Sequence, residues 1–169
     1  MFKVALYLLI AVILAIFLLP FFYTISPYDL NPTKILQAPS IEHLFGTDRL
    51  GRDVFARVLN GGQTSLIIGF LAASISSIVG LFIGINAGYF KGNIDKTITI
   101  TIDLFLTFPT FFLLLALVSY IQASTLILII VISITGWMGM ARMIRSESFA
   151  IGNKPFIKIL KVANVSNFK

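Results

Sequence analysis

Cysteine is absent from this chain of 169 residues, which excludes disulfide bonds and any metal site built on thiolates. His43 is the only histidine, so a site with several histidine ligands is excluded too. The sequence also contains no phosphate-binding loop and no Ser–His–Asp set. We therefore expect a protein that is not an enzyme, with no catalytic residue, no resident metal and no cofactor.

Charge is scarce as well. Charged residues make up 12% of the chain and hydrophobic residues 57%, whereas about 25% of a soluble domain is charged. A short chain cannot bury this much apolar surface in water, so lipid is the expected solvent. The net charge of +6 is then typical of Lys and Arg gathered on the cytoplasmic side of a membrane, and we expect no nucleic-acid partner.

Long apolar runs predict an all-α integral membrane protein. A spanning helix needs about 20 mostly apolar residues. Four segments meet this requirement: residues 4–23, 63–89, 94–120 and 125–143. The first is longer than the apolar part of a signal peptide and no cleavage pattern follows it, so we expect an anchor that stays attached. Short turns at residues 90–93 and 122–124 make the later helices antiparallel neighbours.

The same pattern divides the chain into four parts. We expect an N-terminal anchor (1–25), an extracytoplasmic loop ending in an amphipathic stretch at 50–59 (26–62), three core spans (63–146) and a cytoplasmic tail (147–169). With the N-terminus in the cytoplasm, nine Lys and Arg lie inside and four lie outside. The outer bases are interleaved with acids, which favours salt bridges there over a metal cluster of Glu42, His43, Asp48 and Asp53.

Small residues recur every four positions in the second span, at Ala72, Ser76, Gly80, Gly84 and Gly88. This spacing keeps them on one face of a helix, where they allow another helix to approach closely. Two interpretations remain open at this point. The stripe serves ordinary helix packing, or it marks a helix that slides against its neighbour during a functional cycle.

The third span contains an acid and a proline. A carboxylate such as that of Asp103 is costly in hydrocarbon, so it is expected to pair with another group or to line a wet pathway. Pro109 removes a backbone donor and predicts a bend near the middle of the helix, which is a candidate gating feature.

The tail is amphipathic after Pro155, a residue suited to the first turn of a helix. Its apolar face comprises Phe156, Ile159, Leu160 and Ala163, and its basic face comprises Lys154, Lys158 and Lys161. Such a helix lies on anionic headgroups or docks into another protein. Periodicity does not separate these two alternatives.

Three stretches together resemble one family. Residues 43–57 read HLFGTDRLGRDVFAR, similar to the H-P-F-G-T-D-x-L-G-R-D-V-x-S-R segment of permeases in peptide and nickel ABC importers (the C-type subunit). Residues 88–95 read GYFKGNID, and Gly136-Trp137 is followed by Arg142 and Arg145. The motif residues in the outer loop are Gly46, Thr47, Asp48, Gly51, Arg52 and Asp53.

This resemblance implies a permease of the type I ABC importer fold in the bacterial inner membrane, with about six spanning helices. It implies four partners: a second permease, cytoplasmic ATPases, an extracytoplasmic substrate-binding protein and the bilayer. It also implies a coupling helix that docks on the ATPase, carried here by Phe156, Lys158, Ile159, Leu160, Ala163 and Asn164. The family has an acid where Lys158 stands and a glycine where Asn164 stands.

Relatives of this family continue into two more spans after the coupling loop. We therefore expect the chain to be truncated within that loop. Two functions follow from the resemblance. The chain is a permease subunit that forms part of the pathway for peptides or nickel, or it is a transport-inactive structural or accessory membrane protein derived from one.

Overall fold

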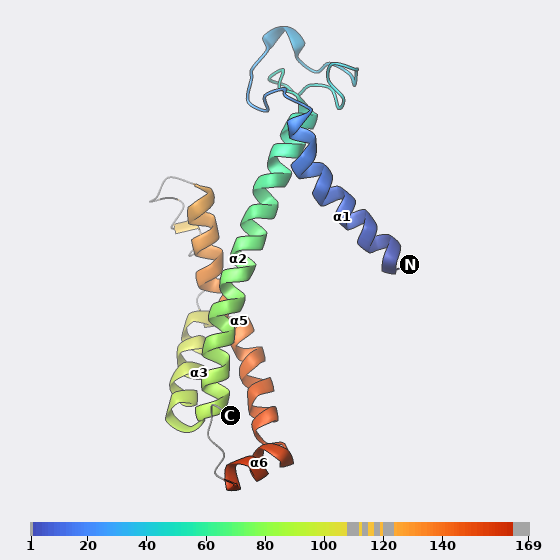
Figure 1. Ribbon diagram of the computed structural model, residues 1–169. Coiled ribbons are helices and arrows are strands. Elements are labelled where there is room, and N and C mark those ends of the chain that lie inside the picture. The colour runs from blue at the N-terminus through green and yellow to red at the C-terminus, as the bar shows by residue number, and fades with distance from the viewer. Residues whose placement is uncertain (1, 108–111, 113–114, 117–118, 120–123, 164–169) are drawn as a thin grey trace. The chain divides into compact units, whose positions relative to one another are not determined.

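The computed structural model describes residues 2–107, 112, 115, 116, 119 and 124–163. Its helices are α1 (Phe2–Leu18), α2 (Val54–Phe90), α3 (Gly92–Thr107), α5 (Thr125–Gly152) and α6 (Pro155–Val162) (Figure 1). Short 3-10 turns occupy Leu19–Phe21 and Pro32–Lys34. The described residues include no β-strand, apart from an isolated antiparallel bridge between Thr47 and Asp53. The prediction of an all-α fold is confirmed.

Three helices in the described part of the chain are long and apolar enough to cross a membrane: Phe2–Phe21, Val54–Phe90 and Thr125–Gly152. They correspond to three of the four expected spans. The expected span at residues 94–120 begins with α3, which starts at Gly92 and can be followed to Thr107. Most of its second half, including Pro109 and the predicted bend, lies outside the described residues.

Helix α2 begins earlier than the sequence predicts, at Val54 instead of near residue 63. Residues 54–59 of the amphipathic stretch predicted at 50–59 therefore form the first turns of this helix. Asp53 caps it, since its Oδ1 accepts a hydrogen bond from the Ala56 N–H at 2.7 Å. Gly61 and Gly62 look like a break, but a helical glycine costs only about 1 kcal/mol relative to alanine. The helix therefore runs through them for 37 residues.

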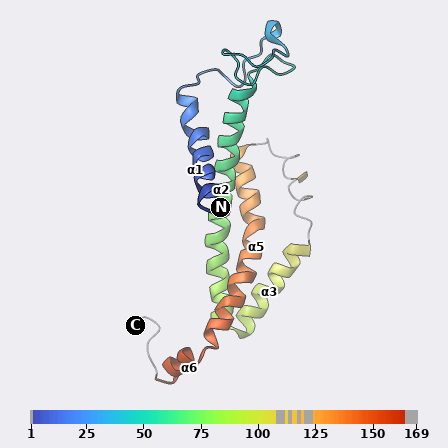
Figure 2. The ribbon, with the colours of Figure 1, turned by 90° about the vertical axis from the view of Figure 1, so that its right-hand side faces the viewer.

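The chain forms two compact units, Met1–Ile67 and Ile68–Lys169. In the first unit, Gly62 leaves room for the Ile16 side chain of α1, and the Gln63 side chain donates to the Ile16 carbonyl at 3.1 Å. In the second unit, α3 and α5 lie alongside α2 (Figures 1 and 2). Its small core contains Ile102, Met138 and Ala141, with Ile83, Ile98 and Trp137 packed around them.

The stripe of small residues on α2 lies against α5. A side-chain carbon added at Gly84 would stand 2.6 Å from the Ala141 carbonyl oxygen, and one at Gly88 would stand 2.7 Å from that of Arg145. Ala72 is buried, and the Ser76 hydroxyl donates to the Ser133 carbonyl at 3.3 Å. The two backbones thus approach closely along several turns, which only residues with small side chains permit.

We predict that Gly84→Ala destabilises the second unit by about 1–3 kcal/mol, because the added methyl meets backbone atoms that cannot move aside. Gly69→Ala is the matched control, since nothing lies within 4 Å of its added carbon. It should leave stability unchanged or raise it by about 1 kcal/mol. Unfolding in mixed detergent, followed by Trp137 fluorescence, measures both. Equal stability of the two variants would contradict the close α2–α5 contact.

Candidate functional site

The loop between α1 and α2, which the sequence predicts to be extracytoplasmic and which we call the outer loop, is organised around the buried carboxylate of Asp53, which is 2% exposed. Besides capping α2, it accepts a hydrogen bond from the Tyr23 hydroxyl at 2.8 Å. Its Oδ2 also lies 2.8 Å from Nδ1 of His43. An ionised carboxylate only accepts hydrogen bonds, so this Nδ1 carries a proton. These bonds join the end of the first span, the loop and the start of α2.

The same contacts shift two pKa values. Burial, together with the hydrogen bond to Asp53 and its charge, raises the pKa of Tyr23 to about 12. For Asp53, burial acts to raise the pKa, but the hydrogen bonds from the Ala56 N–H, His43 and Tyr23 outweigh it and hold the pKa below its usual range. Both shifts keep Asp53 charged and Tyr23 protonated near neutral pH.

Asp48 forms a second polar centre in the loop. It accepts hydrogen bonds from the N–H groups of Leu50, at 2.8 Å, and Arg52, at 3.0 Å. Its carboxylate also pairs with the side chains of Arg52, at 2.8 Å, and Arg57, at 3.2 Å. Asp48 thus forms salt bridges with two of the loop arginines, as the interleaved charges predict. Within the described residues, no three His, Cys, Asp or Glu side chains cluster as a metal ion would require.

The remaining motif residues shape the backbone. Gly46 and Gly51 have φ values of 71° and 72°, which residues with a Cβ rarely adopt. A side chain at either position would also collide with backbone carbonyls of the loop. The Thr47 hydroxyl accepts from the Gln37 N–H at 2.9 Å and donates to the Lys34 carbonyl. The motif residues therefore fold the loop that precedes α2 into a compact unit, which we call the outer platform. Their polar groups form hydrogen bonds within this loop.

In the second unit, two ion pairs join α3 to α5. Arg145 forms a bidentate salt bridge with Asp95, in which Nη2 of Arg145 lies 2.7 Å from Oδ2 of Asp95. Arg142 Nη2 lies 2.5 Å from Oδ1 of Asp103. The sequence singled out Asp103 without naming its partner, and it gave Asp95 and both arginines only as parts of motifs. The signal was present, since acids eight residues apart share one helix face.

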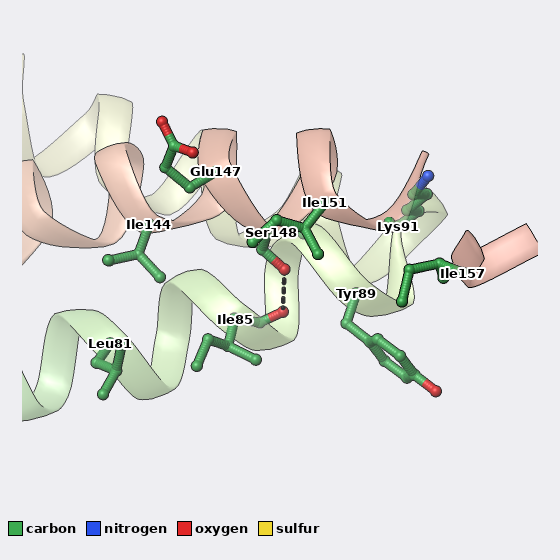
Figure 3. A pocket seen from close by; sticks show the side chains of 11 residues that line it. Leu81, Ile85, Tyr89, Lys91, Ile144, Glu147, Ser148, Ile151 and Ile157 are labelled. Carbon is green, nitrogen blue, oxygen red and sulfur yellow. Dashed lines mark hydrogen bonds between the residues drawn. The ribbon is translucent and has the colours of Figure 1, made fainter. Parts of the chain in front are cut away.

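A pocket of about 340 Å³ lies where α2, α5 and α6 meet (Figure 3). Apolar side chains dominate its wall, and the Ser148 hydroxyl donates to the Ile85 carbonyl at 3.4 Å. From α6, Ile157 lines this pocket. The lining apolar residues from α2 and α5 are Leu81, Ile85, Ile144 and Ile151.

The rest of α6 presents apolar side chains to the surroundings. Phe156 is 54% exposed, Ile159 67% and Val162 88%. These positions are three residues apart, so they share one broad face, on the opposite side from Ile157. Ala163 follows as an exposed residue at the end of this face. The side chains of Lys158 and Leu160, and the whole of Asn164, lie outside the described residues.

We predict that Asp53→Asn loosens the outer loop at neutral pH by about 1–3 kcal/mol, because it weakens three hydrogen bonds to a buried group. Since the folded pKa of Asp53 is depressed, its stabilising effect is present above the unfolded pKa of about 4 and is lost as pH falls through the folded value. Amide hydrogen exchange of the loop, corrected for intrinsic rates, should therefore show acid-dependent loosening in the parent and less in Asp53→Asn.

The control for this variant is Asp29→Asn, which removes an exposed carboxylate from the same loop. It should leave exchange close to that of the parent. Matching exchange profiles for Asp53→Asn and Asp29→Asn would show that the buried carboxylate does not organise the loop.

Known proteins resemble this chain over nearly its whole length. It is 35% identical to the dipeptide transport system permease protein of Alkalihalophilus pseudofirmus, over 92% of this chain and 51% of that protein. It is 31% identical to the oligopeptide transport system permease protein of Haemophilus influenzae, over 91% of this chain and 50% of that protein. It is 32% identical to the oligopeptide transport system permease protein of Bacillus subtilis, over 92% of this chain and 52% of that protein.

The chain thus spans about half the length of these relatives. Residues 76–169 match the family described as the binding-protein-dependent transport system inner membrane component. That stretch contains the α2–α5 contact, both α3–α5 ion pairs and α6. The chain belongs to this family of inner-membrane components of binding-protein-dependent transport systems.

Proposed function

We propose that this chain is part of the translocation pathway of an ABC importer and couples it to cytoplasmic ATPases. The observation that carries the proposal is the exposed apolar face of α6, a short helix that directly follows the spanning helix α5. A helix in this position converts movement of a docked partner into movement of α5. Family membership supports the same role.

Peptides are the substrate class we propose. The curated relatives named above are dipeptide and oligopeptide permeases, which favours peptides over the nickel alternative. The pathway itself would form between this chain and a second permease. Asp103 is the candidate pathway residue, because its side chain remains largely exposed even though it is paired with Arg142.

The outer platform is the proposed contact for an extracytoplasmic substrate-binding protein. Its internal network holds it rigid, and its surface displays apolar side chains such as Ile41, which is 98% exposed, and Phe45. This arrangement requires the loop to face outward, and it agrees with a cytoplasmic N-terminus and with α6 at the cytoplasmic surface. The excess of Lys and Arg in the inner segments supports that orientation.

The α6 face suits a protein groove. Apolar burial contributes about 25 cal/mol per Å², and a few large side chains usually dominate such an interface. Phe156 and Ile159 are the proposed anchors, while Ile157 seats the helix on its own subunit. Lys158 brings a base where the family has an acid, so the matching ATPase surface is expected to carry a complementary acid.

We predict that Ile159→Asp abolishes capture of the cognate ATPase by the detergent-solubilised chain, because it places a charge in the apolar contact. Ile159→Leu should retain capture. Asn93→Asp adds the same charge on another exposed cytoplasmic residue and should also retain capture. Equal capture by Ile159→Asp and the parent would refute docking through this face, and binding of α6 to anionic vesicles instead would assign it to the lipid surface.

Orientation is tested with cysteines, which the natural chain lacks. An impermeant thiol reagent applied to intact cells with a permeable outer envelope should label Ile41→Cys and spare Asn93→Cys, because only the first faces outward. Both should be labelled after the membrane is opened. The reverse pattern would invert the proposed topology.

A further inference from the structure

The turn between α2 and α3 contains a lysine, Lys91, whose role does not follow from family membership. Lys91 occupies it with a φ of 54°, a left-handed conformation that is uncommon for a residue with a long side chain. Such a conformation persists only where surrounding contacts hold it in place. The backbone is held on both sides, since the Lys91 N–H donates to the Ala87 carbonyl at 3.2 Å and the Lys91 carbonyl accepts from the Asp95 N–H at 3.4 Å.

The Lys91 side chain reaches across to the end of α5. Its Nζ donates to Oδ1 of Asn153 at 3.0 Å, a residue 62 positions away in sequence. The same ammonium group lies 4.1 Å from the centre of the Phe149 ring, which is the geometry of a cation–π contact. One side chain therefore makes two specific contacts with the last turns of α5.

Asn153 lies at the corner between α5 and α6. It is the C-cap of α5, and its own N–H donates to carbonyls of the last turn of that helix. The backbone N–H of Lys154 then donates to the Ile151 carbonyl at 3.0 Å, and α6 begins at Pro155. The direction in which α6 leaves α5 is set within this corner, so a group that fixes Asn153 also fixes α6.

We propose that Lys91 is a positioning residue that holds the α5–α6 corner and thereby sets the orientation of α6 relative to the α2–α3 turn. Lys91 also lines the pocket that Ile157 of α6 lines, so the corner is held by a polar contact at Asn153 while α6 meets the same place through an apolar side chain (Figure 3). The importance of this orientation for transport rests on the proposed coupling function. The contacts that Lys91 makes lie within this chain and involve no partner protein.

Because the chain has no cysteine, paired spin labels test the attachment directly. Labels at Asn93→Cys and Ile159→Cys, both exposed positions, report the distance between the α2–α3 turn and α6 in lipid nanodiscs. The parent should give a single narrow distance peak. Lys91→Met, which keeps the length of the side chain but removes the charge and the donor, should lose that peak and give a broad distribution.

Two variants serve as controls: one removes a nearby positive charge, and the other keeps a cationic donor at position 91. Lys96→Met removes a lysine from the neighbouring first turns of α3 and should keep the narrow peak. Lys91→Arg retains a cation with several donors and should restore it. Asn153→Ala should broaden the peak less than Lys91→Met does, because the contact between Lys91 and the Phe149 ring remains. The double variant should be no broader than Lys91→Met alone, since that change already breaks the contact with Asn153.

A second label pair, Ile78→Cys and Ile134→Cys, lies on exposed faces of α2 and α5 and reports on helix packing. Its distance should be unchanged in every variant. A parent-like α6 peak in Lys91→Met would overturn the proposal, and so would broadening at both label pairs, which would assign Lys91 to general packing. No ATPase is present in these samples, so the result is independent of whether α6 docks as proposed.

Discussion

The packing of α2 against α5 is the contact on which the rest of the second unit depends. Lipid chains are as apolar as leucine, so the hydrophobic effect does not drive two spanning helices together. Close backbone contact is the alternative, and the small residues from Ala72 to Gly88 provide it along several turns. With this pair in place, α5 presents its arginines to α3 and carries its last turn to the α2–α3 turn.

Charged groups then specify how the remaining elements attach. Asp95 and Asp103 bind α3 to α5 through paired arginines, which reduces the cost of the positive charges that the apolar helix α5 carries. Outside the spans, the buried carboxylate of Asp53 plays a comparable part in the outer platform. In each place a carboxylate joins segments that lie far apart in sequence.

The sequence predicted those features that depend on local pattern. Apolar run lengths located three spans of the described structure, and four-residue spacing defined the face of α2 that lies against α5. The start of α2 was not predicted, although Asp53 directly precedes Val54 and its carboxylate caps the helix. The partner of Lys91 was not predictable, since it depends on how the helices are rotated about their axes.

The length of α2 exceeds the thickness of the membrane core. Its 37 residues correspond to about 55 Å of helix, while the hydrocarbon core is about 30 Å thick. A helix of this length therefore extends past the hydrocarbon at one end or at both, so part of it meets headgroups or water instead of acyl chains.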